Sequence, residues 1–196
     1  MTPSTTPHPR FQSNPFATRW TRPGACPFLF PGEMTVNQLA IQLRKQQGWG
    51  QIVGPHGSGK STLLAALIPE LDRPPSTAAC YRLQRGQRQL PVSFREPGLV
   101  SCNQVIVDGF EQLSGWTRYR LKQFCRRTSK GLLVTTHRSL GLPNLLPMQP
   151  NLLTAQRIVA YLQRHHEQVI SDEDVRHYYP HDSHNLRELL FALYDL

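Results

Sequence analysis

The chain has 196 residues, 39% of them hydrophobic, so its length fits one domain with a modest core and a small appendage. Lysine and arginine total 22 against 13 acidic residues, and the resulting formal charge of +9 suits a polyanionic partner. No run of about 18 apolar residues is present, and the N-terminus lacks the apolar segment of a secretory signal, so we expect neither a membrane span nor secretion.

The cysteines and histidines show no spacing that is typical of a metal site. Four cysteines are spread along the chain without a CxxC pair, at Cys26, Cys80, Cys102 and Cys125. The eight histidines include no HExxH motif. These patterns indicate free thiols in a reducing compartment, so we expect a cytoplasmic protein without structural zinc.

The first 24 residues differ in composition from the rest of the chain. Proline, threonine and serine dominate residues 1–24, which is typical of a flexible arm. Three aromatic residues interrupt this pattern: Phe11, Phe16 and Trp20. They leave open whether part of the arm packs on the domain beside a bound ligand.

Beyond the arm, apolar periodicity predicts alternating helices and strands. Helices are predicted at 34–47, 61–71, 113–127, 152–166, 172–178 and 184–194. Strands are predicted at 51–53, 79–84, 89–94, 105–108 and 132–136, with a further short strand around 147–149. We expect the strands at 79–84 and 89–94 to be joined at Gly86. The alternation predicts an α/β fold with a mainly parallel sheet, followed by a small all-helical unit.

A glycine-rich loop, G-x-x-x-x-G-K-S, lies between the predicted strand at 51–53 and the predicted helix at 61–71. It consists of Gly54, Pro55, His56, Gly57, Ser58, Gly59, Lys60 and Ser61. Its glycines let successive backbone N–H groups point at phosphate oxygens, and the following helix adds its positive N-terminal end. Lys60 is expected to reach the β- and γ-phosphates, Ser61 to bind Mg²⁺, and Thr62 to lie near the α-phosphate. The motif therefore predicts a three-layer P-loop NTPase core that binds ATP or GTP with Mg²⁺. The absence of an NKxD-like guanine motif favours ATP.

A carboxylate follows the apolar strand at 105–107. Asp108 is predicted to hold Mg²⁺ through water, because ligands of open α/β sheets bind at the carboxyl edge of the strands. The alternative is a turn residue, since Asp-Gly is a turn signal. Many ATPases place a glutamate directly after this aspartate to activate water, but that position is Gly109 here. Glu111 is a candidate for the role, and an exposed glutamate on the first turn of a helix is the rival interpretation.

Polar residues also end the next predicted strand, at 132–136. Thr136 is a candidate sensor of the γ-phosphate, with Thr135 as its alternative, and His137 is a candidate to bind a phosphate oxygen or orient water. The alternative is that these side chains have no functional role and are polar because the strand ends at the solvent. Lys60, Glu111, Thr136 and His137 form the predicted catalytic set so far.

A basic stretch at 116–130 contains aromatic residues among its lysines and arginines. Such a surface can hold nucleic-acid phosphates while aromatic rings stack on bases. The alternative is a helix with core aromatics and solvated charges. Nucleic acid therefore stays one candidate partner.

Three stretches give the chain a resemblance to the AAA-type ATPases of the additional-strand branch of P-loop NTPases. They are GPHGSGKST at 54–62, VIVDGFEQL at 105–113 and NLREL at 185–189, the last similar to the sensor 2 element of the helical lid. The resemblance implies that Arg187 reaches the γ-phosphate and that Thr135 or Thr136 takes the sensor 1 position. It also implies a core at 25–150, a helical lid at 151–196, a magnesium-dependent ATPase activity and a protein partner or homo-oligomer. His184 replaces the usual glycine, and no convincing arginine finger follows the sensor 1 strand.

Two other classes of P-loop protein stay open beside this resemblance, and a third is excluded. Leu113-Ser114-Gly115 is similar to part of the signature sequence of ABC-type ATPases, but it follows Asp108 instead of preceding it. In addition, only 48 residues separate Lys60 from Asp108. The ABC-type ATPases are therefore excluded. A small-molecule kinase stays an alternative, because arginines between 118 and 127 can serve a lid. A nucleotide-dependent switch with little hydrolysis also stays an alternative, and Gly109 favours it because many ATPases have a glutamate at that position.

Overall fold

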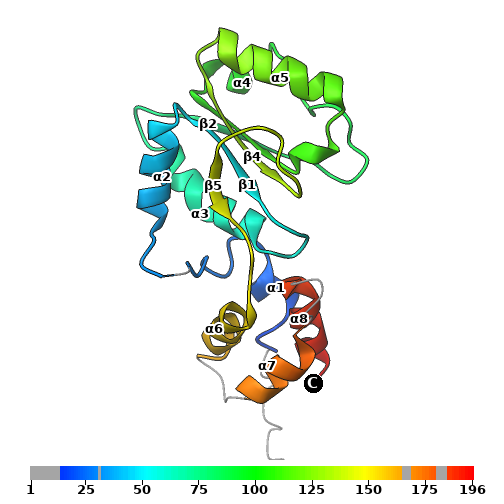
Figure 1. Ribbon diagram of the computed structural model, residues 1–196. Helices are drawn as coiled ribbons and strands as arrows, with labels where there is room; N and C mark the ends of the chain where they lie inside the picture. Colours follow the sequence, from blue (N-terminus) through cyan, green and yellow to red (C-terminus); the bar gives the residue numbers. More distant parts are fainter. Residues whose placement is uncertain (1–13, 31, 165–168, 180–184) are drawn as a thin grey trace, which may run out of the picture.

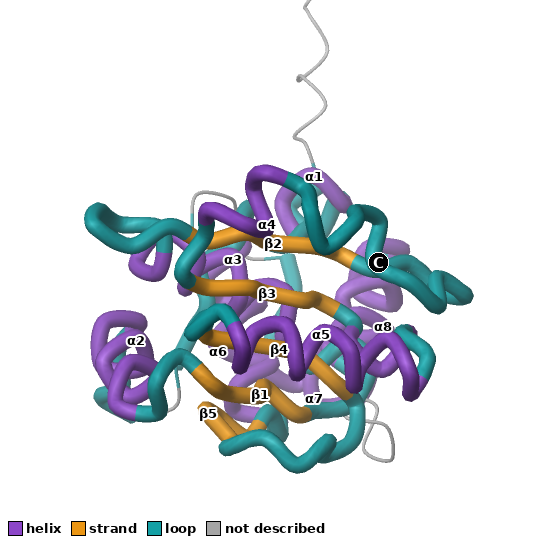
Figure 2. The backbone as a smooth tube through the Cα atoms, turned by 90° about the horizontal axis from the view of Figure 1, so that it is seen from above, coloured by secondary structure: helices purple, strands orange, loops and turns teal. Residues whose placement is uncertain are grey.

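The computed structural model describes residues 14–30, 32–164, 169–179 and 185–196 (Figure 1). Within these ranges, five parallel strands form one sheet in the order β2-β3-β4-β1-β5, which Figure 2 shows from top to bottom. The strands are β1 (Trp49–Val53), β2 (Ala78–Arg82), β3 (Gln104–Asp108), β4 (Gly131–Thr136) and β5 (Asn144–Pro147). The strand β4 lies between β1 and β3, so the strand before the glycine-rich loop and the strand that ends at Asp108 are not direct neighbours.

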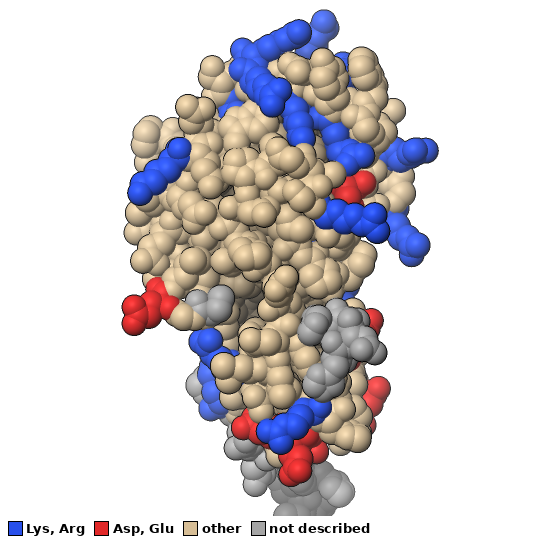
Figure 3. All heavy atoms as spheres, viewed as in Figure 1, with Lys and Arg blue, Asp and Glu red and all other residues tan. Residues whose placement is uncertain are grey.

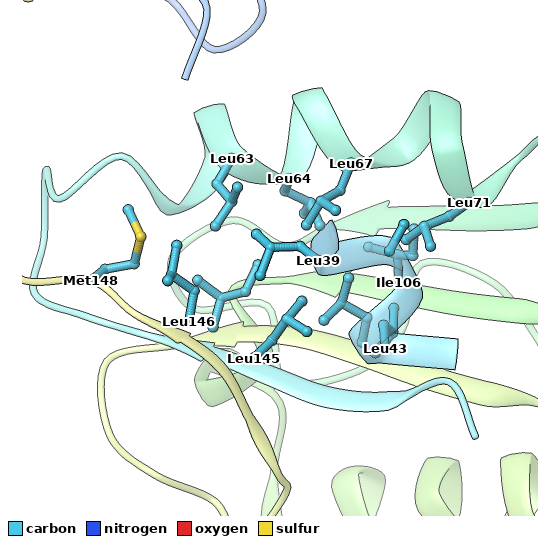
Figure 4. Close-up of a cluster of buried hydrophobic side chains, with 13 residues drawn as sticks. Leu39, Leu43, Leu63, Leu64, Leu67, Leu71, Ile106, Leu145, Leu146 and Met148 are labelled. Atoms are coloured by element: carbon cyan, nitrogen blue, oxygen red, sulfur yellow. The ribbon is translucent and has the colours of Figure 1, made fainter. Parts of the chain in front are cut away.

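Helices cover both faces of the sheet and make it the middle of three layers. One face is covered by α2 (Val36–Lys45) and α3 (Lys60–Leu71), and the other by α4 (Pro97–Ser101) and α5 (Gly115–Arg127). Along β3, Val105 and Val107 face the α5 side, while Ile106 faces the α3 side, as the two-residue period of a strand requires. Figure 4 shows the α3-side cluster, in which leucines of α2, α3 and β5 meet Ile106.

The helix ends follow local sequence signals. Thr35 caps α2 in a capping box with Gln38, and Gly48 adopts a positive φ of 77° just after the helix. Ser114 caps α5 by accepting a hydrogen bond from the Thr117 N–H. These signals explain why the predicted helices at 34–47 and 113–127 agree with α2 and α5 to within two residues at each end.

A separate helical unit follows β5 and lies below the sheet in Figure 1. It consists of α6 (Leu152–Gln163), α7 (Asp172–Tyr178), α8 (Leu186–Ala192) and a final 3₁₀ turn, η2 (Leu193–Asp195). Its own apolar cluster includes Val159, Val175 and Leu189. The structure therefore contains the predicted helical unit, while the expected start of the last helix at 184 and the end of the first beyond 164 lie outside the described residues.

The N-terminal arm joins this helical unit. A short helix, α1 (Thr18–Thr21), follows Phe16, which is 4% exposed and packs in the same cluster as Val159. Asn14 Nδ2 donates a hydrogen bond of 2.9 Å to the Tyr194 carbonyl. The arm is predicted to be flexible, with packing of part of it left open. Asn14 and Phe16 contact the helical unit, and the burial of Phe16 favours that contact. Phe11 lies outside the described residues.

Two predictions of strands were wrong or displaced. Residues 89–94 form no strand, and the chain passes through turns into α4, which the sequence did not predict. Their alternating Leu90, Val92 and Phe94 pack on the α5-side cluster instead of pairing with β2, and Pro91 has no N–H to donate. The last strand lies at 144–147, not around 147–149.

Two further expectations concern membrane-spanning helices and the state of the cysteines. None of the helices in the described ranges is long and apolar enough to cross a membrane. All four cysteines are free thiols, as predicted. Burial raises the pKa of Cys125 to about 12, so this thiol stays protonated at neutral pH.

Candidate functional site

A cavity of about 620 Å³ lies between the carboxyl edge of the sheet and the helical unit. Its walls come from the loop after β1, the ends of β2, β3 and β4, the connection after β5, the N-terminal arm and helix α8. The carboxyl edge is where open parallel sheets bind ligands, and the cavity lies within the size range of small-molecule sites. Figure 3 shows the surface drawn in between the upper and lower parts of the molecule at this level.

The glycine-rich loop connects β1 directly to α3 and forms one wall of the cavity. Two of its glycines have positive φ, 69° at Gly57 and 90° at Gly59, a conformation that side chains disfavour. From His56 to Thr62 every residue lines the cavity, and Gly54 and Pro55 lie behind them. The α3 helix begins at Lys60, so its positive N-terminal end faces the same space.

The Lys60 side chain is folded back into its own loop. Its Nζ donates hydrogen bonds to the carbonyls of Gly54 at 2.8 Å and Pro55 at 2.6 Å, and the residue is 9% exposed. Burial lowers the pKa of Lys60, and the carboxylates of Glu111 and Asp108 counter part of that effect. A compact cation is thus held at the floor of the cavity, within reach of an anion that enters it.

Asp108 ends β3 in a set of oriented hydrogen bonds. Its Oδ1 accepts a bond of 2.6 Å from the hydroxyl of Thr135, which in turn accepts from the Gly109 N–H at 2.8 Å. Its Oδ2 lies 3.3 Å from Nε of Arg82 at the end of β2. Thr135 therefore orients the carboxylate, while Ser61 and Glu111 line the same cavity.

Glu111 is paired with His137 in the cavity wall. The residue lies on a 3₁₀ turn, η1 (Phe110–Gln112), and its Oε1 is 3.0 Å from Nε2 of His137. Its other oxygen, Oε2, is buried without a hydrogen-bond partner among the described residues. With the ring proton on Nε2, the His137 Nδ1 is free to accept from Lys60 Nζ, 3.4 Å away. The orphaned oxygen marks a place where a water or an ion can be held.

His56 and Thr136 are the two remaining predicted residues near His137, and only His56 lines the cavity. The His56 ring contacts the His137 ring at a tilt of 39°, with centroids 3.7 Å apart. Burial, followed by the charges of His137 and Lys60, lowers the pKa of His56. Thr136 is fully buried and its hydroxyl donates to the Arg138 carbonyl, so it does not line the cavity. Of the two sensor candidates, Thr135 is the one that faces the ligand space.

Helix α8 rests on the glycine-rich loop at Gly57. A side chain added at Gly57 would overlap the Asn185 carboxamide and come within 3.3 Å of Arg187 Cβ. Asn185 caps α8 by accepting from the Arg187 N–H, and Arg187 is exposed and lines the cavity. The structure thus brings Arg187 to the same cavity as Lys60, although 127 positions separate them in the sequence. Asp182, an alternative ion-pair partner of Arg187, lies outside the described residues.

The rest of the cavity wall, called the apolar end below, is mostly apolar, and its Phe28 ring lies against the glycine-rich loop, 3.6 Å from where a Cβ at Gly59 would be. Three segments that are far apart in the sequence contribute to it, and Phe28, Ile158 and Leu190 represent them. None of these side chains was predicted as a site residue, because apolar side chains that line a pocket have the same sequence signal as core residues. This end provides a surface for a flat, weakly polar group.

Two arginines at the carboxyl end of β2 line the cavity and were not among the predicted site residues. Arg82 ends β2 and contacts Asp108, and Arg85 follows the strand. The signal for them was present in the sequence, since they lie at the carboxyl end of a predicted strand. Their sheet neighbour could not be predicted, because β2 pairs with β3 only through non-local contacts.

The oxygen donors of the cavity match the preferences of Mg²⁺. Ser61 supplies a hydroxyl, Asp108 a carboxylate, and Glu111 a carboxylate oxygen that lacks a partner. Hard oxygen ligands of this kind suit Mg²⁺, which keeps several waters and binds one or two carboxylates together with substrate phosphates. The residues present therefore fit a hydrated magnesium ion.

Comparison with known proteins supports the fold. No family model matches the sequence. No curated protein matches it. A solved structure of AMPPCP-bound DnaA from Aquifex aeolicus is similar to the chain, with a TM-score of 0.58 and 14% sequence identity. The match covers 85% of this chain and 61% of that chain, so the present chain spans less than two thirds of its length. The chain has the fold of the P-loop NTPases, as its glycine-rich loop predicts.

Proposed function

We propose that the chain binds ATP with Mg²⁺ in this cavity. One observation carries the proposal: a glycine-rich loop between a strand and a helix holds a buried lysine opposite an oriented aspartate. Backbone N–H groups, a helix N-terminus and a lysine cation together form a phosphate site. The likeness to an AMPPCP-bound DnaA gives the proposal independent support.

The triphosphate is proposed to lie along the loop from His56 to Thr62. An entering phosphate offers Lys60 a full negative charge in place of the two carbonyls that it bonds in this structure. Ser61 and Asp108 are proposed to hold Mg²⁺, which neutralises the phosphate charge. The base is proposed to lie at the apolar end, beside the segment after the arm that contains Phe28.

We further propose slow, magnesium-dependent hydrolysis of the β–γ phosphoanhydride, as in AAA-type ATPases. Glu111 would orient a water at its unpartnered Oε2 and accept the proton when the water oxygen attacks the γ-phosphorus. The bond to the β–γ bridging oxygen breaks, which leaves ADP and phosphate. Arg187 would stabilise charge on the γ-phosphate from the helical unit. The position of β4 between β1 and β3 supports the additional-strand branch.

A nucleotide-dependent switch with little hydrolysis is the second candidate. The contact between Glu111 and His137 favours it, because a glutamate oxygen that accepts a hydrogen bond from a histidine is less available as a base. Gly109 directly after Asp108 also favours it, since no glutamate occupies the position that many ATPases use. In this case the bound ATP would set the position of the helical unit without being consumed.

Binding and hydrolysis can be tested separately on the purified chain. Calorimetric titration with ATP, ADP and GTP, with and without Mg²⁺, should show magnesium-dependent binding of ATP. Phosphate release is then followed for the wild type, Glu111→Gln and His137→Ala. Loss of release in Glu111→Gln with unchanged binding supports the ATPase, and absence of release from the wild type supports the switch. A failure of every nucleotide to bind would refute both.

A further inference from the structure

The positive charge of the chain is concentrated in one quarter of its length. Residues 82–130 contain ten lysines and arginines but only three acidic residues, so they carry +7 of the net charge of +9. Seven of these ten cations are exposed, whereas all three carboxylates are at least partly buried. Each carboxylate also has a partner: Glu96 caps α4, Asp108 bonds Thr135, and Glu111 pairs with His137. Lys and Arg side chains accordingly gather over the upper part of the molecule in Figure 3, where Figure 1 shows α4 and α5.

Two large aromatic rings lie exposed among these cations. Trp116 is 68% exposed and Tyr119 is 55% exposed, and their rings stack with centroids 5.8 Å apart. Arg120 and Arg127 follow Trp116 at spacings of four and eleven residues, so they lie on the same outer face of α5. The inner face of α5 is fixed in the core by Leu121 and Cys125, both 0% exposed. The aromatic and cationic side chains are therefore presented outward on a rigid element.

The loop before α4 extends the cationic surface beside α5. Its Arg88 carbonyl accepts a hydrogen bond of 3.0 Å from the Ser114 N–H at the start of α5. Further along, the Arg120 guanidinium lies over the Phe94 ring, 5.1 Å from its centroid. These contacts hold the loop alongside the helix, so Arg88 and Arg95, both exposed, add their charge to that of α5.

We propose that this surface, formed by α5 and the loop at 88–95, binds a single-stranded polynucleotide. The arginines would bind consecutive phosphates, and Trp116 and Tyr119 would stack on unpaired bases. Single strands combine both kinds of contact, because their phosphates are charged and their base faces are open. In a duplex the base faces are covered by stacking, so two exposed rings would gain little. An anionic membrane fits less well, because the apolar face of α5 that would enter the lipid is buried in the core.

The proposed surface is separate from the nucleotide cavity, although the two are close in the sequence. Arg82 and Arg85 line the cavity, while Trp116, Tyr119, Arg120 and Arg127 do not. Substitutions at the latter four positions should therefore leave nucleotide binding unchanged. Because the inference goes beyond the proposed nucleotide function, its test needs no nucleotide.

The test is fluorescence anisotropy with labelled oligothymidylate and oligouridylate of about 20 nucleotides, compared with duplex DNA of the same length. We expect tighter binding to the single strands, and affinities about tenfold weaker in Trp116→Ala and in Tyr119→Ala. Arg127→Glu should also weaken binding, and it should reduce the slope of log affinity against log salt by about 0.7 for each phosphate that the protein no longer neutralises. Lys45→Glu on α2 and Tyr178→Ala on α7 are controls of matched chemistry outside the proposed surface and should change neither. Thermal unfolding checks that each variant folds.

The outcomes separate the proposal from its rivals. Binding to DNA, to RNA or to both single strands, with weaker binding in the two aromatic variants, supports the proposal and identifies the polymer. Equal affinity for duplex and single strand, unchanged by Trp116→Ala and Tyr119→Ala, would overturn it in favour of unspecific attraction of a polyanion. Binding to phosphatidylserine vesicles without binding to either oligonucleotide would overturn it in favour of a membrane surface.

Discussion

The two ends of the cavity are built in different ways. The phosphate end comes from consecutive residues, His56 to Thr62, and from polar side chains at the ends of adjacent strands. The apolar end comes from the segment at 21–29, helix α6 and helix α8, which meet only in the folded chain. The first end is held by hydrogen bonds within one loop and one sheet, and the second by apolar packing between remote segments. A local motif therefore determines the chemistry of the site, while tertiary packing determines its shape.

The strongest test of the phosphate end is removal of the Lys60 charge. Lys60→Ala should weaken ATP binding by about 100-fold, because a charge-assisted contact to phosphate is worth about 1.5–3 kcal/mol. Calorimetry gives the affinity, and Lys45→Ala on α2 controls for the general removal of a cation. An equal affinity in Lys60→Ala and the wild type would refute the assignment of the glycine-rich loop.

The contact between the two ends can be broken at Gly57. Gly57→Ala should cost about 2–3 kcal/mol of unfolding free energy, from its positive φ and from overlap with Asn185. Gly86→Ala is the matched control, since Gly86 also has a positive φ but no atom within 4 Å of an added Cβ. The difference between the two variants in chemical denaturation isolates the contact with α8. If Gly57→Ala costs no more than Gly86→Ala, helix α8 does not rest on the loop in solution.

The role of Asp108 at the phosphate end can be tested by varying Mg²⁺. Asp108→Asn should weaken ATP binding by about tenfold in the presence of Mg²⁺ and much less in its absence, because the carboxylate acts through the ion. Titrations in excess Mg²⁺ and in excess chelator measure the two cases. Similar effects under both conditions would reduce Asp108 to the orienting hydrogen bond that it shares with Thr135.

The helical unit is tested by nucleotides that differ only in the γ-phosphate. Arg187→Ala should lower the affinity for ATP about fivefold more than that for ADP, since an exposed arginine contributes about 1 kcal/mol to a charged contact. Arg176→Ala on α7 serves as the control in the helical unit. Equal effects on ATP and ADP would remove the proposed γ-phosphate role and leave Arg187 as a wall residue.

The smallest expected effect is a pH dependence from His56. Burial and two neighbouring cationic groups lower the pKa of His56 in the folded chain, so the unfolded chain binds its proton more readily. Stability should therefore fall as the pH drops below about 6.5, the ordinary pKa of histidine, until the folded-state pKa is passed. Thermal unfolding of the wild type and His56→Gln between about pH 7 and pH 5 measures this difference. A steeper decline in His56→Gln would contradict the sign.

The sequence predicted the parts of the fold that depend on short-range signals. The strand, glycine-rich loop and helix from 51 to 71 were recognisable because glycine spacing and apolar periodicity extend over adjacent residues. The apolar run that ends at Asp108 was recognisable because a strand buried on both faces has no alternation. The prediction at 89–94 was wrong because alternation also arises when a loop packs its apolar residues on a core.

The sequence could not show which of the polar candidates face the ligand. Thr135 and Thr136 are adjacent and chemically identical, yet the strand period turns one to the cavity and the other to the Arg138 backbone. The pair between Glu111 and His137 and the contact of Asn185 with Gly57 join residues 26 and 128 positions apart. Such contacts depend on sheet order and on the placement of the helical unit, which no local pattern specifies.

The hydrogen bond from Asn14 to Tyr194 joins residues 180 positions apart and has a consequence for the order of folding. Phe16 is synthesised well before Leu189 and Leu193, which belong to the cluster that buries it. Contacts of such large sequence separation cost the most loop-closure entropy and form late. We therefore expect a folding intermediate in which the sheet and the glycine-rich loop are native while the arm is still undocked. In that intermediate the phosphate end of the cavity is formed before the wall that the arm adds.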